Sequence, residues 1–282
     1  MARELSASVD PGALYVVSTP IGNLGDVTAR AAQILGAVDE ILAEDTRTTR
    51  VLLEHLGVRT PLRALHEHNE AAQSAGVVAR LQEGASIALV SDAGTPLVSD
   101  PGERLLRAVI DAGCRVVPVP GPSAVLAALA ASGLPAVPFS FFGFVPRRGR
   151  EREVFEAQLR DSAWTTVCFE SPHRVVETLT RWRDSGMADR PVVLARELTK
   201  HFETFVRGTV AEVAAYLAEQ APRGEIVLVL GGAPVRAGPD VQDLAAQVAA
   251  WRAAGDTPRT IQQRLTTEFG VARNMAYRLA HE

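Results

Sequence analysis

The chain has 282 residues, of which 47% are hydrophobic and 22% are charged, and its formal net charge is −4. This composition is globular and excludes a disordered or fibrous chain, and the negative charge excludes a protein that coats nucleic acid by bulk attraction. The sequence has no apolar run of about 18 residues and no apolar signal core, so we expect neither a membrane span nor a secretion signal. Its only cysteines are Cys114 and Cys168, so we expect no disulfide framework. Together these features predict a cytoplasmic protein.

The first half alternates short β-branched runs with helical segments, which is typical of an α/β fold with a largely parallel sheet. Asp26 is suited to cap a helix from about Val27 to Ala37, and an alanine-rich helix follows from Ala124. The predicted strands are Ala13–Val17, Glu40–Ala43, Ser86–Val90 and Arg115–Val119. Each strand runs into a loop rich in Gly, Pro, Asp, Ser or Thr. Because ligands bind at the carboxyl ends of strands in open α/β sheets, we expect the four loops to form one pocket.

An arginine-rich stretch after Phe144 marks a predicted boundary, so that a first α/β domain spans residues 1–145 and a second spans 146–234. The elements predicted in the second domain are strands at 165–169, 192–195 and 226–230, a hairpin strand near 202–206, and helices near 175–183 and 210–221. Small residues make 231–239 a linker. Residues 240–282 are predicted to form a helix-turn-helix-like module, with Thr257 and Pro258 beginning one helix and Gly270 ending it.

The loop Ser91–Gly102 is the most specific local feature. An ordinary strand-to-helix connection takes about two to six residues, whereas this loop takes twelve, including Asp92, Asp100, two prolines and two glycines. Glycine lets a backbone approach a ligand closely, and carboxylates accept hydrogen bonds from hydroxyl or amino groups. The loop therefore indicates ligand binding more than a simple connection.

Two further charged segments follow strands. The segment Glu44–Arg47 is explained in part by Asp45 or Thr46 as a helix cap, which leaves the second carboxylate and Arg47 unexplained. The segment Arg196–Glu203 contains Lys200, the only lysine among 29 basic residues. His66 and His68 are spaced to point to opposite faces of a strand and have no suitable third ligand, so no metal site is expected.

Four arginines and one glutamate give a charge of +3 between Pro146 and Arg152. Clustered guanidinium groups bind phosphate, which predicts an RNA-binding segment. A solvated linker between domains is the alternative interpretation. The arginines are Arg147, Arg148, Arg150 and Arg152.

Taken in order, these motifs resemble those of the tetrapyrrole methylase superfamily, and within it the 16S rRNA (cytidine-2′-O)-methyltransferases that modify the small ribosomal subunit. The resemblance covers about 220 residues. It is carried by LYVVSTPIGNLGD (14–26), AEDTRTTRVLL (43–53), SDAGTPLVSDPG (91–102), PVPGPSAVLAAL (118–129), FFGFVPRRGRER (141–152), FESPHRV (169–175), RELTKHFETFVRGT (196–209) and GEIVLVLGG (224–232).

The resemblance implies two α/β domains with S-adenosyl-L-methionine in the cleft between them, a homodimer, and methylation of a cytidine 2′-hydroxyl in 16S rRNA. It also implies cofactor contacts from eight residues, namely Ile21, Gly94, Thr95, Val98, Ser123, Ala124, Phe169 and Glu225. Relatives that act on tetrapyrroles tend to have Gly-Asp-Pro where this chain has Gly94–Pro96, which argues against a tetrapyrrole substrate.

A ribose 2′-hydroxyl is a poor acid, so its methylation benefits from a general base. We hypothesise that Asp45 or Glu197 is this base and that Lys200 or Arg47 orients the phosphate of the nucleotide. No metal is required. Two alternatives remain at this point: a tetrapyrrole (precorrin-type) methyltransferase, and a regulator that binds nucleic acid through its terminal helices.

Overall fold

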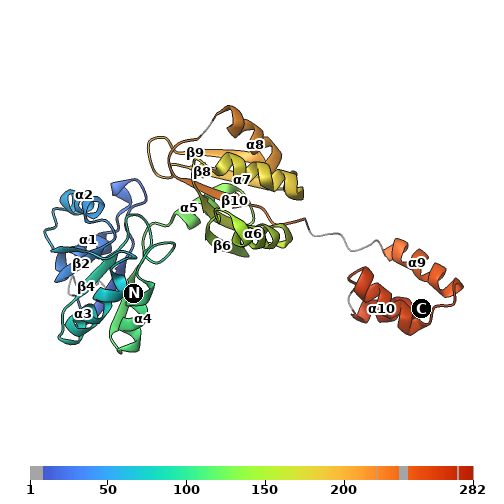
Figure 1. The fold of residues 1–282 in the computed structure, drawn as a ribbon, viewed down its shortest axis with the longest axis horizontal. Helices are drawn as coiled ribbons and strands as arrows, with labels where there is room; N and C mark the ends of the chain where they lie inside the picture. The colour runs from blue at the N-terminus through green and yellow to red at the C-terminus, as the bar shows by residue number, and fades with distance from the viewer. Residues whose placement is uncertain (1–8, 221, 235–240, 272, 282) are drawn as a thin grey trace, which may run out of the picture. The chain divides into compact units, whose positions relative to one another are not determined.

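A computed structural model describes residues 9–220, 222–234, 241–271 and 273–281 (Figure 1). The chain divides into two compact units, Met1–Ala233 and Pro234–Glu282. The predicted linker at 231–239, the start of the helical module at Asp240 and its end at Glu282 lie wholly or partly outside the described residues.

The first unit contains two five-stranded sheets. In the first sheet the strand order is β3-β2-β4-β1-β5 and every pairing is parallel, as the alternating pattern predicts. Its strands are β1 (Ala13–Val17), β2 (Glu40–Ala43), β3 (Leu62–Ala64), β4 (Ile87–Val90) and β5 (Arg115–Val119). The helices around it are α1 (Ala29–Ala37), α2 (Thr46–Leu56), α3 (Glu70–Gln82) and α4 (Glu103–Asp111), with a short 3-10 turn η1 (Leu24–Asp26).

Side chains of the first sheet alternate between two buried cores, because successive residues of a strand point to opposite faces. In β1, Tyr15 packs in the core that includes Leu35 of α1 and Leu52 of α2. Leu14 packs in the opposite core with Leu81 of α3 and residues of α4. With both faces covered by helices, the sheet leaves its edge at the carboxyl ends of the strands as the place for a ligand.

The second sheet is mixed, with the order β6-β7-β10-β8-β9. Strands β6 and β7 are parallel, and the remaining pairs are antiparallel. The strands are β6 (Phe139–Phe144), β7 (Thr165–Glu170), β8 (Pro191–Arg196), β9 (Thr204–Thr209) and β10 (Ile226–Leu230). One face packs in a core with α6 (Gly149–Asp161), α7 (Val175–Trp182) and α8 (Val210–Glu219), and a π-helical turn η2 (Arg183–Met187) follows α7.

Helix α5 (Ala124–Ser132) joins the two halves of this unit. It begins directly after the loop that follows β5, with Ser123 as its N-cap, yet it packs on the second sheet. Val125, Ala128 and Leu129 share a core with Val193 of β8 and Val227 of β10. Ile21, from the loop after β1, belongs to the same core. The loops of the first sheet are thereby held against one face of the second.

The sequence placed most strands within one or two residues of their observed ends. The hairpin strand expected near 202–206 is β9 at Thr204–Thr209, and the strands β3 and β6 were not predicted. Because β6 pairs with β7, the second sheet begins at Phe139, while the domain boundary between residues 145 and 146 stays a prediction.

The second unit contains α9 (Val241–Ala253), α10 (Pro258–Glu268) and α11 (Arg273–His281), packed around Trp251, Ile261 and Leu265. Thr257 caps α10, with Pro258 in its first turn, and Gly270 follows the helix with a φ of 64°. The predicted start and end signals of this helix are confirmed.

Candidate active site

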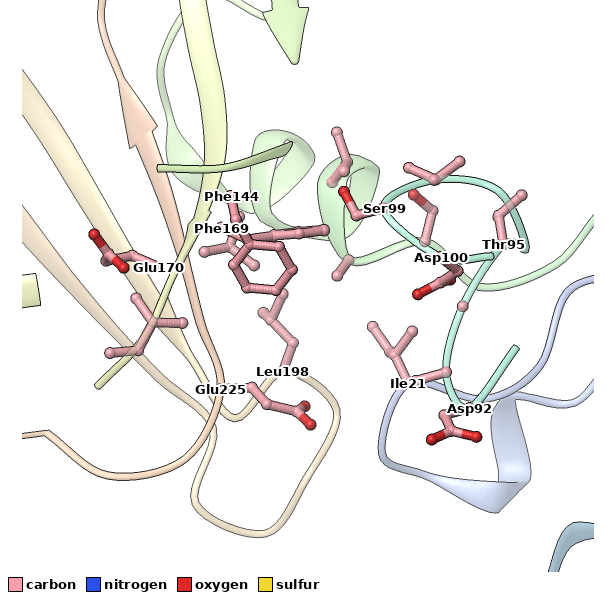
Figure 2. A pocket seen from close by; sticks show the side chains of 18 of the residues that line it. Ile21, Asp92, Thr95, Ser99, Asp100, Phe144, Phe169, Glu170, Leu198 and Glu225 are labelled. Carbon is pink, nitrogen blue, oxygen red and sulfur yellow. The ribbon is translucent and has the colours of Figure 1, made fainter. Parts of the chain in front are cut away.

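A cavity of about 480 Å³ lies where loops from the carboxyl ends of the first sheet meet the second sheet (Figure 2). Loops after β1, β2, β4 and β5 all contribute to its lining. The prediction that these loops converge on one pocket is therefore confirmed. We call this cavity the first pocket.

The long loop after β4 is fixed to the loop after β1 by backbone pairing. The Thr19 amide donates to the Gly94 carbonyl at 2.8 Å, and the Gly94 amide donates to the Thr19 carbonyl at 3.1 Å. Gly94 has a φ of 79°, and a Cβ there would lie 3.3 Å from Cγ2 of Ile21. Leu97 and Ser99 of the same loop also have positive φ, a conformation that non-glycine residues adopt at a cost and mainly at functional sites.

The second half of the unit supplies the opposite wall. Phe169 at the end of β7 packs edge to face on Phe144, with ring centroids 5.3 Å apart. Leu198 and Glu225 complete this side, and Figure 2 shows them across the cavity from Ile21 and Asp92. The wall is mainly apolar, which suits the flat face of a heterocyclic ring.

Carboxyl groups gather in the first pocket. Burial, reinforced by the charge of Asp92, raises the pKa of Asp100 to about 6. Burial and the charges of Asp100 and Asp92 raise the pKa of Glu44, and burial raises the pKa of Asp92. Glu170 also lines the cavity, but it is buried and bound to Arg174 and Thr178. Of the described residues, no lysine, arginine or histidine lines this pocket.

Lys200 lies in the loop between β8 and β9, where it joins two carboxylates. Its Nζ is 2.9 Å from Oε1 of Glu197 and 3.0 Å from Oε2 of Glu225. Burial lowers the pKa of Lys200, but these hydrogen bonds and charges outweigh burial and raise it overall. The Glu225 amide also donates to Glu197, and this bond together with Lys200 lowers the pKa of Glu197.

Asp45 begins α2 as its N-cap and accepts a hydrogen bond from the Arg47 amide at 2.8 Å. The Arg47 guanidinium binds the same carboxylate, at 2.6 Å between Nη2 and Oδ2. These bonds from Arg47 lower the pKa of Asp45 to about 2. The Asp45 amide donates to Asp92 Oδ1 at 3.0 Å, which connects the start of α2 to the long loop.

A second cavity, of about 380 Å³, adjoins the first, and we call it the second pocket. Both pockets share the residues Ile21, Asp92, Ala93 and Glu225. The rest of the second pocket comes from the loop after β1, the first turns of α2, Ser91 and Lys200. The two cavities therefore adjoin at these four residues.

The structure brings most of the predicted site residues together. All eight predicted cofactor contacts line the first pocket: Ile21, Gly94, Thr95, Val98, Ser123, Ala124, Phe169 and Glu225. Two of the four catalytic candidates lie together: Lys200 lines the second pocket, and Glu197 accepts a hydrogen bond from Lys200. The other two, Asp45 and Arg47, lie at the start of α2. Their chemical roles stay predictions.

The predicted RNA-binding arginines lie between β6 and the first turn of α6. Arg147, Arg148 and Arg150 are exposed, whereas Arg152 is half-buried and pairs with Glu177 at 3.1 Å. Three of the four guanidinium groups are thus on the surface.

Asp92 and Asp100 were predicted only as ligand-binding acceptors in the long loop, and Phe144 and Leu198 were not predicted as site residues. Two aspartates in a long loop indicated a ligand site in the sequence. The raised pKa of Asp100 could not be predicted, because it depends on burial in the folded chain. His66 and His68 follow β3 in a turn, so their expected placement on a strand was wrong. The described residues contain no cluster of three metal-ligating side chains, and none of their helices is long and apolar enough to cross a membrane.

Comparison with known proteins decides the family. A family model described as Tetrapyrrole (Corrin/Porphyrin) Methylases matches residues 13–214, well over half of the chain. The chain belongs to this family. The resemblance in the sequence motifs is confirmed, and so is the expected α/β fold with a helical segment after it.

Relatives of this tetrapyrrole methylase cover from 79% to 96% of the chain. A protein of Synechocystis sp. named Ribosomal RNA small subunit methyltransferase I is 41% identical over 96% of this chain and 98% of its own length. Proteins of the same name from Xylella fastidiosa and Escherichia coli O157:H7 are 49% and 47% identical over 79% and 82% of this chain, each covered over 82% of its own length.

Solved structures share the fold at lower identity. Uroporphyrin-III-C-methyltransferase from Thermus thermophilus has a TM-score of 0.57 and 24% identity over 78% of this chain and 94% of its own. Diphthine synthase has a TM-score of 0.61 and 16% identity over 78% of this chain and 90% of its own. These likenesses establish the fold alone.

Proposed function

We propose that this protein transfers a methyl group from S-adenosyl-L-methionine to the ribose 2′-hydroxyl of a cytidine in 16S rRNA of the small ribosomal subunit. The observation that carries the proposal is the first pocket, an apolar and acidic cavity at the strand ends that all eight expected cofactor contacts line. Relatives named as ribosomal RNA methyltransferases at 41% to 49% identity support an RNA acceptor.

The lining of the first pocket fits this cofactor. Phe144 and Phe169 offer aromatic edges and faces to an adenine ring, and Asp100 and Glu44 offer carboxylates to ribose hydroxyls or an ammonium group. Because no basic side chain among the described residues faces the cavity, a phosphate-bearing cofactor has no charge partner there. Gly94 leaves room where a Cβ would press on Ile21.

When bound, S-adenosylmethionine supplies an electrophilic methyl group: the acceptor oxygen forms the new C–O bond, the sulfur keeps the electron pair of the broken C–S bond, and the hydroxyl proton leaves. Alignment of donor and acceptor supplies up to about 7–11 kcal/mol of such a barrier. Apolar side chains on both sides of the first pocket, Ile21 on one and Phe169 and Leu198 on the other, support that alignment. A carboxylate against the sulfonium would stabilise the ground state more than the transition state, so the acidic groups serve the ribose, the amino-acid tail or the incoming hydroxyl.

Three carboxylates are candidates for accepting the proton. Asp45 and Glu197 follow from the sequence, but their lowered pKa values make both weak bases. Asp92 belongs to both pockets and has a raised pKa, so geometry and basicity favour it over the other two. We propose that Asp92 takes the proton and that Asp45 and Glu197 hold Arg47 and Lys200 in place.

The test is methyl transfer to small ribosomal subunits that lack the modification. Purified protein should transfer labelled methyl groups to 16S rRNA, and mass analysis of nuclease fragments should place them on a cytidine ribose. Activity on a tetrapyrrole with none on ribosomal subunits would overturn the proposal. The homodimer and the cytoplasmic location are proposed from the family resemblance, and sedimentation of the purified chain tests the former.

A further inference from the structure

We propose that the second pocket binds the target nucleoside of single-stranded RNA and that the Thr49 hydroxyl is a specificity-determining hydrogen-bonding group in it. The proposal rests on the proposed function, because it takes the first pocket as the methyl-donor site. It adds the place of the acceptor and a residue that reads it.

The position of the second pocket suits an acceptor. It shares Ile21, Asp92, Ala93 and Glu225 with the first pocket, so the two cavities meet at these residues, where an acceptor in one could reach a donor in the other. Its volume of about 380 Å³ is within the range of small-molecule sites, roughly 300–1,000 Å³.

Thr49 lines the second pocket, and its hydroxyl is buried without a partner among the described residues. The residue is only 4% exposed, and its Oγ1 finds no hydrogen-bond partner among the described residues. Buried hydroxyl groups are nearly always hydrogen-bonded, so an exception beside a cavity indicates a partner that arrives with a ligand.

The Thr49 hydroxyl, unpaired within the described ranges, is unusual for a threonine in a helix. A helical threonine commonly satisfies its hydroxyl on the carbonyl four residues earlier. Thr266 and Thr267 in α10 do so, each at 2.8 Å. The Thr49 amide bonds the Asp45 carbonyl in the ordinary helical way at 3.1 Å, yet the Thr49 hydroxyl makes no such bond. The hydrogen-bonding capacity of this hydroxyl is therefore unused within the described residues.

The remaining lining fits a nucleoside drawn out of a single strand. Pro20, Leu24 and Leu52 give apolar surface for a base or sugar face, and Lys200 and Asp92 add polar groups. Sequence-specific RNA recognition usually takes an unstacked base and hydrogen-bonds its edge. A hydroxyl that both donates and accepts can bond the amino group or the carbonyl of cytosine. Exposed Arg47 and Arg50 on the same helix are placed for flanking phosphates.

The experiment compares Thr49→Val, Thr49→Ser and a matched control, Thr180→Val in α7, a threonine that lines neither pocket. Three quantities are measured: the melting temperature, the affinity for S-adenosylhomocysteine, and the affinity for a short single-stranded RNA with either a central cytidine or an abasic residue there. Steady-state methyl transfer to unmodified small ribosomal subunits is measured alongside.

T49V should melt at or above the wild-type temperature, because it loses no hydrogen bond within the part of the chain that the structure describes, and should bind S-adenosylhomocysteine unchanged. Its affinity for the cytidine RNA should fall about 5- to 10-fold, with a matching rise in KM for ribosomal subunits, and it should bind the abasic RNA as the wild type does. T49S should recover the cytidine affinity, and T180V should behave as the wild type.

T49V with wild-type affinity for the cytidine RNA would overturn the assignment, whether its melting temperature is unchanged or lowered. An equal loss on the abasic RNA would do so as well. Failure of the proposed function is separate, since it appears in the wild-type protein as absent cofactor binding or absent methyl transfer.

Discussion

The ammonium group of Lys200 lies 3.0 Å from a carboxylate oxygen of Glu225, a residue that both pockets share. Lys200 also holds Glu197, and its alkyl stem packs so closely on Gly22 that a Cβ there would lie 2.5 Å from Cγ of the lysine. The loop between β8 and β9 thus joins the loop after β1 and the start of β10. The only lysine of the chain connects the two halves of the site.

Replacement of Lys200 by methionine should impair activity far more than stability. Methionine keeps the stem over Gly22 but frees Glu197 and Glu225. Because such partly exposed ion pairs contribute about 0–1 kcal/mol, denaturant unfolding should change by less than that. Hydrogen bonds to charged groups that position a site are worth about 1.5–3 kcal/mol, so kcat/KM for ribosomal subunits should fall about 10- to 100-fold. A K200M variant with normal kcat/KM would show that the loop connection has no role in the reaction.

Asp92→Asn should cause the largest loss among the carboxylate variants. If Asp92 accepts the proton, kcat should fall about 10²- to 10⁴-fold while S-adenosylhomocysteine affinity changes little. D45N should be milder, because asparagine is as good an N-cap as aspartate, and E197Q keeps an acceptor for Lys200. Single-turnover methyl transfer separates the chemical step from binding. Near-normal turnover in D92N with a large loss in D45N or E197Q would instead assign the base to Asp45 or Glu197, whichever variant shows the loss.

The ends of β1, β2, β4 and β5 could be predicted because each is a short run rich in apolar residues that enters a loop rich in Gly, Pro, Asp, Ser or Thr, whereas the three-residue strand β3 was not predicted. Parallel pairing then places the loops at one edge, and the pocket follows. The links between distant segments could not be predicted. Lys200 and Glu225 are 25 residues apart in sequence, and their contact depends on the packing of β8 against β10. The burial of the Thr49 hydroxyl without a partner among the described residues likewise depends on the packing of the fold.

The aromatic strand β6 shows a second limit of prediction from sequence, which is the assignment of a strand to a sheet. Phe139–Phe144 was assigned to the first domain because the following arginines mark the obvious change in composition. Its pairing with β7 makes it a strand of the second sheet, and Phe144 at its end lines the first pocket. Composition locates a change of surface character, whereas membership of a sheet is decided by hydrogen bonds to a partner strand.

Gly94→Ala should weaken cofactor binding beyond its effect on stability. Gly57 at the end of α2 is the matched control, because its φ is 66° and a Cβ there meets nothing within 4 Å. An alanine in this left-handed region costs roughly 1–2 kcal/mol in either position. Only G94A also presses on Ile21, so its Kd for S-adenosylhomocysteine should rise about tenfold while that of G57A stays unchanged. Equal Kd values by calorimetry would contradict the role given to this loop.

Asp100→Asn should stabilise the protein at neutral pH. The pKa of Asp100 is raised from 3.8 to about 6, so the folded chain holds the proton more tightly than the unfolded chain. The carboxyl group therefore favours folding below pH 3.8, and that contribution is lost as the pH rises from 3.8 to 6. D100N avoids the loss, and its advantage in free energy of unfolding should grow over this range to about 1 kcal/mol at pH 7, discounted for partial solvation.

The control for D100N is Asp111→Asn at the exposed end of α4, where the free energy of unfolding should shift by less than about 0.5 kcal/mol. Denaturant unfolding at several pH values between 4 and 7 gives the comparison. A stability difference between D100N and wild type that does not vary with pH would mean that Asp100 is ionised normally in the folded protein.

The exposed arginines after β6 should contribute to RNA binding through phosphate contacts. Because single strands release about 0.7 counterion per phosphate contacted, four contacts would give a log–log salt slope near −2.8. Replacing Arg147, Arg148 and Arg150 together with alanine should make that slope shallower by about 2 and weaken RNA binding, with S-adenosylhomocysteine affinity unchanged. A control variant of the same charge replaces three exposed arginines of the first half, Arg59, Arg104 and Arg107. If both triple variants make the slope shallower by the same amount, the effect is one of net charge and the segment after β6 is a solvated linker. If RNA binding weakens only in the variant of Arg147, Arg148 and Arg150, the segment contacts RNA.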